Sequence, residues 1–274
     1  MMGWLKIVDA AALMVGAWLI AAAAPPREQD AAVARAEDRG TTMFWYDRAA
    51  WVSTDDMTAR LPPDRLADIG GWVVTPAGPG YHVAYFGKAG MADRVLYEVD
   101  IQGPASSNAR TYTDDKAPRL EGAASRMAAA LLAARAELGR HADWQSCTDG
   151  PFNTIVLPPD RDGTIPVYFL TPQIDWVEVP LGGHYEVDID ASGTVRSTRG
   201  FTRACFNVPM QADVAGKKAG SFWMTHLLDP QPTEVHVFEQ FSMAMPLFVG
   251  ITEPKSVWKV ENGHITRANE AALD

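Results

Sequence analysis

One short polar stretch, THLLDPQPTEVH, could do chemistry. It contains His226, Glu234 and His236, and two imidazoles with a carboxylate are donors that a zinc-type ion takes. If residues 233–238 form a strand, Glu234 and His236 share one face of it. A turn through Asp-Pro-Gln-Pro could then bring His226 beside them. The stretch predicts a candidate metal or acid–base site, and the alternative is a solvated strand face with incidental histidines.

A second polar row follows the text HYEVDID. His184, Glu186, Asp188 and Asp190 alternate there with apolar residues, which is typical of a half-buried antiparallel strand. Side chains along one strand are spaced too far apart to share a calcium ion unaided. We therefore interpret this row as a solvated face.

The common catalytic signatures are missing from the sequence. It contains no G-x-S-x-G elbow, phosphate-binding P-loop, G-x-G-x-x-G, H-E-x-x-H or C-x-x-C motif. These absences argue against the common cofactor classes, and we expect no cofactor. Sites assembled from distant residues stay open. The tryptophans are spread one or two to an element, which favours core packing over a sugar-binding platform.

The beginning of the chain has the pattern of a secretory signal peptide. Residues 1–24 hold one lysine, an apolar run and small residues, followed by Pro25. The run is shorter than the roughly 20 residues that a membrane-spanning helix needs. We expect cleavage before Ala24, so that the mature protein is periplasmic or secreted and keeps no stable membrane span. The alternative is an uncleaved amphipathic or anchoring helix.

Composition excludes some classes of function. The chain has 274 residues and a formal net charge of −10. This negative charge disfavours binding to nucleic acid, whose phosphates it repels. Its two cysteines, Cys147 and Cys205, suggest one disulfide in an oxidising compartment. Buried free thiols are the alternative.

The elements around these residues indicate an α+β fold with mostly antiparallel sheets. Residues 25–40 read as a spacer or frayed helix, and residues 43–66 as helical pieces interrupted at Pro62-Pro63. Residues 118–139 predict a long packing helix, because apolar residues repeat every three or four positions. That face consists of Leu120, Ala124, Met127, Leu131, Ala134 and Leu138. Short Val-rich and aromatic runs separated by Gly/Pro turns predict strands elsewhere, TEVHVFEQF among them.

The two sets of strands resemble each other. The segments 73–86 and 155–169 share a strand–turn–strand pattern ending in Tyr-Phe, and each precedes the letters YEVDI, at 97–101 and 185–189. This predicts a duplicated helix–three-strand unit, with coincidence as the alternative. We therefore expect a first helix–sheet unit over 41–116 and a second one with C-terminal strands over 117–274.

FNTIVLPP, IPVYFLTPQ, GGHYEVDIDASG and THLLDPQPTEVHVF resemble segments of a set of exported alphaproteobacterial proteins. That resemblance covers most of the mature chain and implies no activity. HYEVDIDASGTV is also similar to the strand–turn–strand ending of PepSY-type exported modules, which combine a helix with a small antiparallel sheet. It implies no catalytic residue.

Together these features predict an exported binding or interaction module without catalysis, whose partner is a protein or a small molecule. The alternative is a metal-assisted hydrolase that uses His226, Glu234 and His236. A third reading, an envelope-associated structural protein, predicts self-association through an exposed sheet edge.

Overall fold

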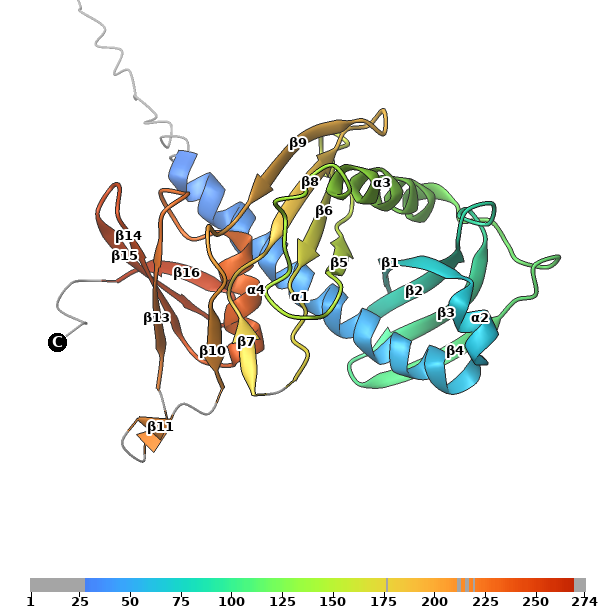
Figure 1. Cartoon of the computed structure of the whole chain (residues 1–274), viewed down its shortest axis with the longest axis horizontal. Helices are drawn as coiled ribbons and strands as arrows, with labels where there is room; N and C mark the ends of the chain where they lie inside the picture. The colour runs from blue at the N-terminus through green and yellow to red at the C-terminus, as the bar shows by residue number, and fades with distance from the viewer. Residues whose placement is uncertain (1–27, 176, 211–212, 215–216, 219, 269–274) are drawn as a thin grey trace, which may run out of the picture.

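A single long helix organises the fold. The computed structural model describes residues 28–175, 177–210, 213–214, 217–218 and 220–268, so the predicted signal peptide lies outside the described residues. Helix α1, Glu28–Arg60, crosses the molecule and contacts all three of its four-stranded sheets (Figure 1). It includes residues 28–40, where the sequence predicted a spacer or frayed helix. The break at Pro62 is confirmed, because a second helix, α2, begins at Pro63.

The first sheet is an antiparallel meander in the order β1-β2-β3-β4. Its first three strands are those that the sequence predicted, whereas the exposed and polar β4 was not predicted. The elements of this part are α2 Pro63–Ala67, β1 Ile69–Ala77, β2 Gly80–Gly87, β3 Val95–Gln102 and β4 Ala105–Thr111.

The second sheet repeats the arrangement after helix α3, Gly122–Leu138. The helix predicted over 118–139 is confirmed with a later start, and Met127, Leu131 and Ala134 are buried on its inner face. The strands are β5 Asn153–Val156, β6 Ile165–Leu170, β8 Tyr185–Ile189 and β9 Val195–Gly200. They form the antiparallel order β5-β6-β8-β9.

The two YEVDI segments occupy equivalent strands, because β3 and β8 are both third in their sheets. Val83 pairs with Val99 in the first sheet, as Val167 pairs with Val187 in the second. The sheets have four strands each rather than the expected three. This register also aligns Tyr85 with Phe169, one position away from the match of the sequence letters.

The third sheet has the order β13-β14-β15-β16 and contains one parallel pair. Helix α4, Glu234–Met243, connects β13 to β14, as a crossover between parallel strands requires. The strands are β13 Phe222–His226, β14 Leu247–Ile251, β15 Ser256–Glu261 and β16 His264–Arg267. Two small pairs precede them: β7 Glu178–Pro180 with β10 Asn207–Pro209, and β11 Asp213–Val214 with β12 Lys217–Lys218.

The core has two parts. The larger lies between α1, α3 and the first two sheets, and the smaller lies between α4 and the third sheet. Three of the tryptophans predicted to pack in the core, Trp45, Trp51 and Trp223, are exposed, whereas Trp258 is buried. Trp176 lies outside the described residues. None of the helices in the described part of the chain combines the length and apolarity needed to cross a membrane.

Candidate functional site

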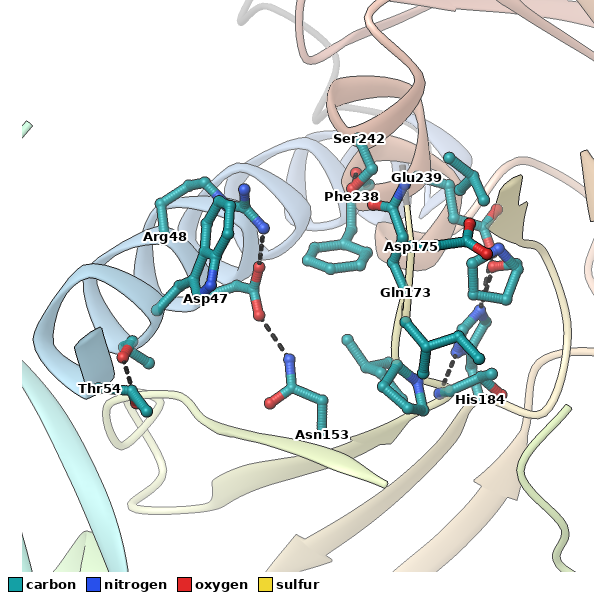
Figure 2. A pocket seen from close by; sticks show the side chains of 18 of the residues that line it. Asp47, Arg48, Thr54, Asn153, Gln173, Asp175, His184, Phe238, Glu239 and Ser242 are labelled. Carbon is teal, nitrogen blue, oxygen red and sulfur yellow. Dashed lines mark hydrogen bonds and ion pairs between the residues drawn. The ribbon is translucent and has the colours of Figure 1, made fainter. Parts of the chain in front are cut away.

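A pocket of about 390 Å³ opens between α1, α4 and the segment that follows β6 (Figure 2). This size lies within the range of small-molecule sites. Its apolar walls come from Trp51 and Trp72, with Leu170, Ile174, Val179 and Phe238. Polar groups stand at two ends, one on α1 and the other on α4.

Asp47 provides the polar end on α1. It lies on the buried face of the helix between Met43 and Ala50, with only 9% of its surface exposed. Its carboxylate accepts hydrogen bonds from Asn153 Nδ2 and, at 2.8 Å, from Arg48 Nη2. The Arg48 guanidinium also lies 4.5 Å from the centre of the Trp51 ring, which is a cation–π contact. Asp47 is therefore held in place and partly neutralised.

The polar end on α4 is a buried histidine–glutamate pair. His184 Nε2 lies 3.0 Å from Glu239 Oε1, and both side chains are almost fully buried. His184 Nδ1 accepts a hydrogen bond from the Thr171 N–H, so the Nε2 carries the proton of the neutral ring. His184 Nε2 also lies 3.1 Å from the Pro180 carbonyl oxygen, which accepts its hydrogen bond.

The carboxyl group of Glu239 is left without a well-directed hydrogen bond to either oxygen among the described residues. Its distance to His184 is short, but the Nε2–H is oriented to be shared with Pro180. Burial raises the pKa of Glu239, and the neighbouring His184 acts in the opposite direction. A buried carboxyl group whose oxygens lack well-directed hydrogen bonds is costly, even with His184 at 3.0 Å.

The remaining wall is the segment 172–175 between β6 and β7. The side-chain nitrogen of Gln173 is buried there without a hydrogen-bond partner among the described residues, whereas Ile174 is 62% exposed. A hydrogen bond next to a disulfide holds this wall in place. Cys147 and Cys205 form the predicted disulfide, with Cα atoms 5.3 Å apart, and Thr148 Oγ1 donates a hydrogen bond to the Pro172 carbonyl oxygen.

The structure does not bring all three residues of the predicted metal site together. The strand expected over 233–238 is wrong, because these residues begin helix α4. Thr233 caps the helix, and His236 completes a capping box by accepting the Thr233 N–H at its Nδ1. His226 and His236 do meet, with ring centres 4.6 Å apart, but Glu234 points to a different cluster. Among the described residues, no three metal-ligating side chains are arranged to hold an ion.

The two imidazoles have structural partners instead. His226 Nε2 lies 2.8 Å from Asp229 Oδ2, which also accepts from Arg199. Burial, together with the neighbouring His226, lowers the pKa of His236 well below its usual range. His236 is therefore a neutral capping residue.

Glu234 belongs to a buried ionic cluster at the start of α4. Its Oε1 accepts a hydrogen bond from Tyr168 at 2.9 Å and lies 3.7 Å from Arg39 on α1. Arg39 also pairs with Glu186 at 2.9 Å and with Asp160. Burial and the neighbouring Glu234 raise the pKa of Glu186 to about 7. The cluster joins α1, α4 and the second sheet, and we assign it a structural role.

The prediction that residues 184–190 form a solvated face is wrong for His184 and Glu186, which are buried. The physical reason is that helices cover both faces of β8. Helix α3 packs on one side, and Arg39 of α1 meets Glu186 on the other. Asp188 and Asp190 are only partly buried, and Asp190 accepts backbone N–H groups in the following hairpin turn.

Comparisons with family models, with curated proteins and with solved structures found no match for this chain. The site must therefore be interpreted from its own geometry. Its mixed apolar and polar lining suits the binding of a small molecule, because apolar walls supply contact area and a few polar groups fix orientation. The sequence signal for it was faint: Asp47 interrupts the row Met43, Ala50, Met57 on the buried face of a helix.

Proposed function

We propose that this protein is an exported binding module that holds a small molecule in the pocket between α1, α4 and the segment 172–175. The observation that carries the proposal is the buried carboxyl group of Glu239, which lacks a well-directed hydrogen bond in the wall of a pocket of ligand size. Perturbed titratable groups in a cleft are typical of functional sites.

The proposed ligand is partly apolar and carries polar groups at one end. Trp51, Trp72 and Phe238 would contact its apolar part, while Glu239 and Gln173 would bind the polar end. Both polar groups are shielded from solvent in this structure. Their contact with a ligand requires the side-chain adjustments that are common at binding interfaces.

Export is supported by two features. The first 24 residues have the composition of a signal peptide, and Cys147 and Cys205 lie at bonding distance. Disulfides persist mainly in oxidising compartments. Mass spectrometry of the protein recovered from the periplasm or the medium should find a terminus near Ala24. An intact Met1 on that material would contradict export with cleavage.

Ligand retention tests the binding function. The protein purified from its native host would be analysed by mass spectrometry under non-denaturing conditions, and released small molecules would be identified. Ser242 lines the pocket on α4, so Ser242→Phe should fill the space and lose the bound molecule. Ser242→Ala is the matched control and should retain it. Equal retention by both variants, with unchanged circular dichroism, would place the ligand elsewhere.

A further inference from the structure

A second hollow lies apart from the pocket described above. It has a volume of about 310 Å³ and runs between β13 and the segment 201–206 that follows β9. Its lining is mainly apolar and includes Leu181, Phe201, Phe206, Trp223, Leu227 and Leu228. None of these residues lines the pocket beside Glu239.

The groove follows the edge of β13 rather than one of its faces. Residues 223–228 all line it in an unbroken run. Successive side chains of a strand point to opposite faces, so an unbroken run of lining residues in the strand places the hollow alongside its backbone.

The edge of β13 that faces away from β14 has no paired strand among the described residues. β13 is an end strand of its sheet and pairs with β14 alone among the described strands. The Phe222 N–H donates to the Pro246 carbonyl oxygen at 2.9 Å, on the side of β14. In a parallel pair, alternate residues point their backbone groups to the same neighbour. The N–H and C=O groups of Trp223 and Thr225 therefore point toward the groove.

The side chains around this edge are unusually apolar for a surface. Phe206 is 53% exposed, Trp223 46% and Leu227 58%. The protein carries a net charge of −10, yet none of the described residues that line the groove is an aspartate or glutamate, and Arg203 is among them. The groove therefore favours an occupant that combines apolar side chains with a negative charge.

We propose that this groove binds an extended peptide segment of a partner protein, which adds a strand to β13. The backbone of the peptide would hydrogen-bond to the N–H and C=O groups of Trp223 and Thr225. Its apolar side chains would cover Phe206 and Leu227, and a carboxylate would pair with Arg203. Strand addition of this kind obtains affinity from the main chain and specificity from pockets for alternate side chains. The inference is independent of the function proposed for the first pocket.

Peptide selection provides the test. A library of acetylated hexapeptides with free C-terminal carboxylates would be incubated with the full chain, and the retained peptides identified by mass spectrometry. We expect apolar sequences with dissociation constants below about 1 mM, an affinity ordinary for a short segment. Amidation of the C-terminus, or Arg203→Gln, should weaken the best peptide several-fold.

A proline substitution separates strand addition from nonspecific apolar contact. Thr225→Pro removes one outward N–H from an edge strand, where proline is tolerated, and should weaken binding at least tenfold. Thr225→Val keeps the N–H and should bind as the unmodified protein does. Circular dichroism of both variants checks the fold.

Three results would overturn the proposal. One is that no peptide binds more tightly than about 1 mM. Another is equal affinity of Thr225→Pro and Thr225→Val. The third is a dimer that forms with rising concentration and is lost in Thr225→Pro, because a second copy of the chain would then be the occupant of the edge.

Discussion

His184 Nε2 lies 3.0 Å from Glu239 Oε1, and this contact joins the second sheet to the crossover helix of the third. His184 directly precedes β8, and Glu239 lies in the middle of α4. Neither side chain has solvent to compensate its polarity. A buried pair whose carboxyl group is incompletely hydrogen-bonded lowers the stability of the folded protein. This cost falls in the wall of the pocket.

Replacing Glu239 by glutamine should make stability less dependent on pH. Burial raises the pKa of Glu239 in the folded protein above its usual value near 4.5. The folded state therefore holds a proton that the unfolded chain has already released, and stability falls as the pH rises from 4.5 through the raised pKa. Glu239→Gln removes this loss, so the stability of the variant relative to the unmodified protein should increase from pH 5 to pH 8.

Urea unfolding at the two pH values measures the effect. Leaving a buried group unsatisfied costs about 1–3 kcal/mol, which sets the size of the expected gain. Glu178 is an exposed glutamate on β7, so Glu178→Gln is the matched control that removes a carboxylate outside the buried pair. If Glu239→Gln behaves like this control, the carboxyl group is not the strained group of the pocket.

His236 should make the protein less stable as the pH falls, whereas Glu239 makes it less stable as the pH rises. Burial keeps its pKa well below 6.5 in the folded protein. The unfolded chain takes up a proton near pH 6.5, so the stability that this neutral ring provides is complete above that pH and is lost as the pH falls. Glutamine at the same position can complete a capping box without titrating.

Two variants distinguish capping from titration. His236→Gln should keep the stability near pH 7.5 and flatten its decline below pH 6.5. His236→Ala should lose about 1 kcal/mol or more at every pH, because the cap is gone. Thermal unfolding across pH 5–7.5 measures both. A decline with falling pH that is equally steep in His236→Gln would assign the acid sensitivity to other groups.

His236 explains why helix α4 was hard to predict from sequence. Elements with clear periodicity could be predicted, and α3 and the first three strands of the first sheet are examples. In these elements the residues that suit burial also favour the local secondary structure. TEVHVFEQF alternates like a strand and contains two valines. Its helical start depends on the Thr233–His236 capping box, in which histidine replaces the usual Glu or Gln.

The pocket itself could not be predicted, because its polar groups come from elements far apart in the chain. Asp47, Asn153 and Glu239 line one pocket only because α1, β5 and α4 pack around it. Only Asp47 gave a local signal, as an acid on the buried stripe of a helix. His184 and Glu186 were misinterpreted because an alternating strand does not reveal whether helices cover both of its faces.

The disulfide should be a major source of stability. Cys147 and Cys205 are 58 residues apart, and closing a loop of that size is worth about 4 kcal/mol in the chain-entropy model. The double variant Cys147→Ser/Cys205→Ser should therefore lose on the order of 4 kcal/mol of unfolding free energy in urea. The unmodified protein in excess reductant is the control and should lose a similar amount. A loss of unfolding free energy below about 1 kcal/mol in both would mean that the unfolded chain gains little conformational freedom when the disulfide is removed.

Gly40 sets the distance between the two helices that carry the pocket. A Cβ at this position of α1 would lie 2.5 Å from the Glu234 carbonyl oxygen and 2.5 Å from the Val237 Cβ, both on α4. Alanine normally favours a helix interior over glycine by about 1 kcal/mol. Here overpacking against backbone should exceed that gain, so Gly40→Ala should lose about 1–3 kcal/mol.

Gly139 is the matched control because its backbone is ordinary and its surroundings are open. It follows α3 with φ −64°, and a Cβ there would come no closer than 3.5 Å to a neighbouring atom. Gly139→Ala should be neutral or stabilise by up to about 1 kcal/mol, since it restricts the unfolded chain. Urea unfolding should thus show a loss of stability for Gly40→Ala and no loss for Gly139→Ala. A stabilised Gly40→Ala would mean that α1 can move away from α4 without cost, and the pocket between them would not be a rigid binding site.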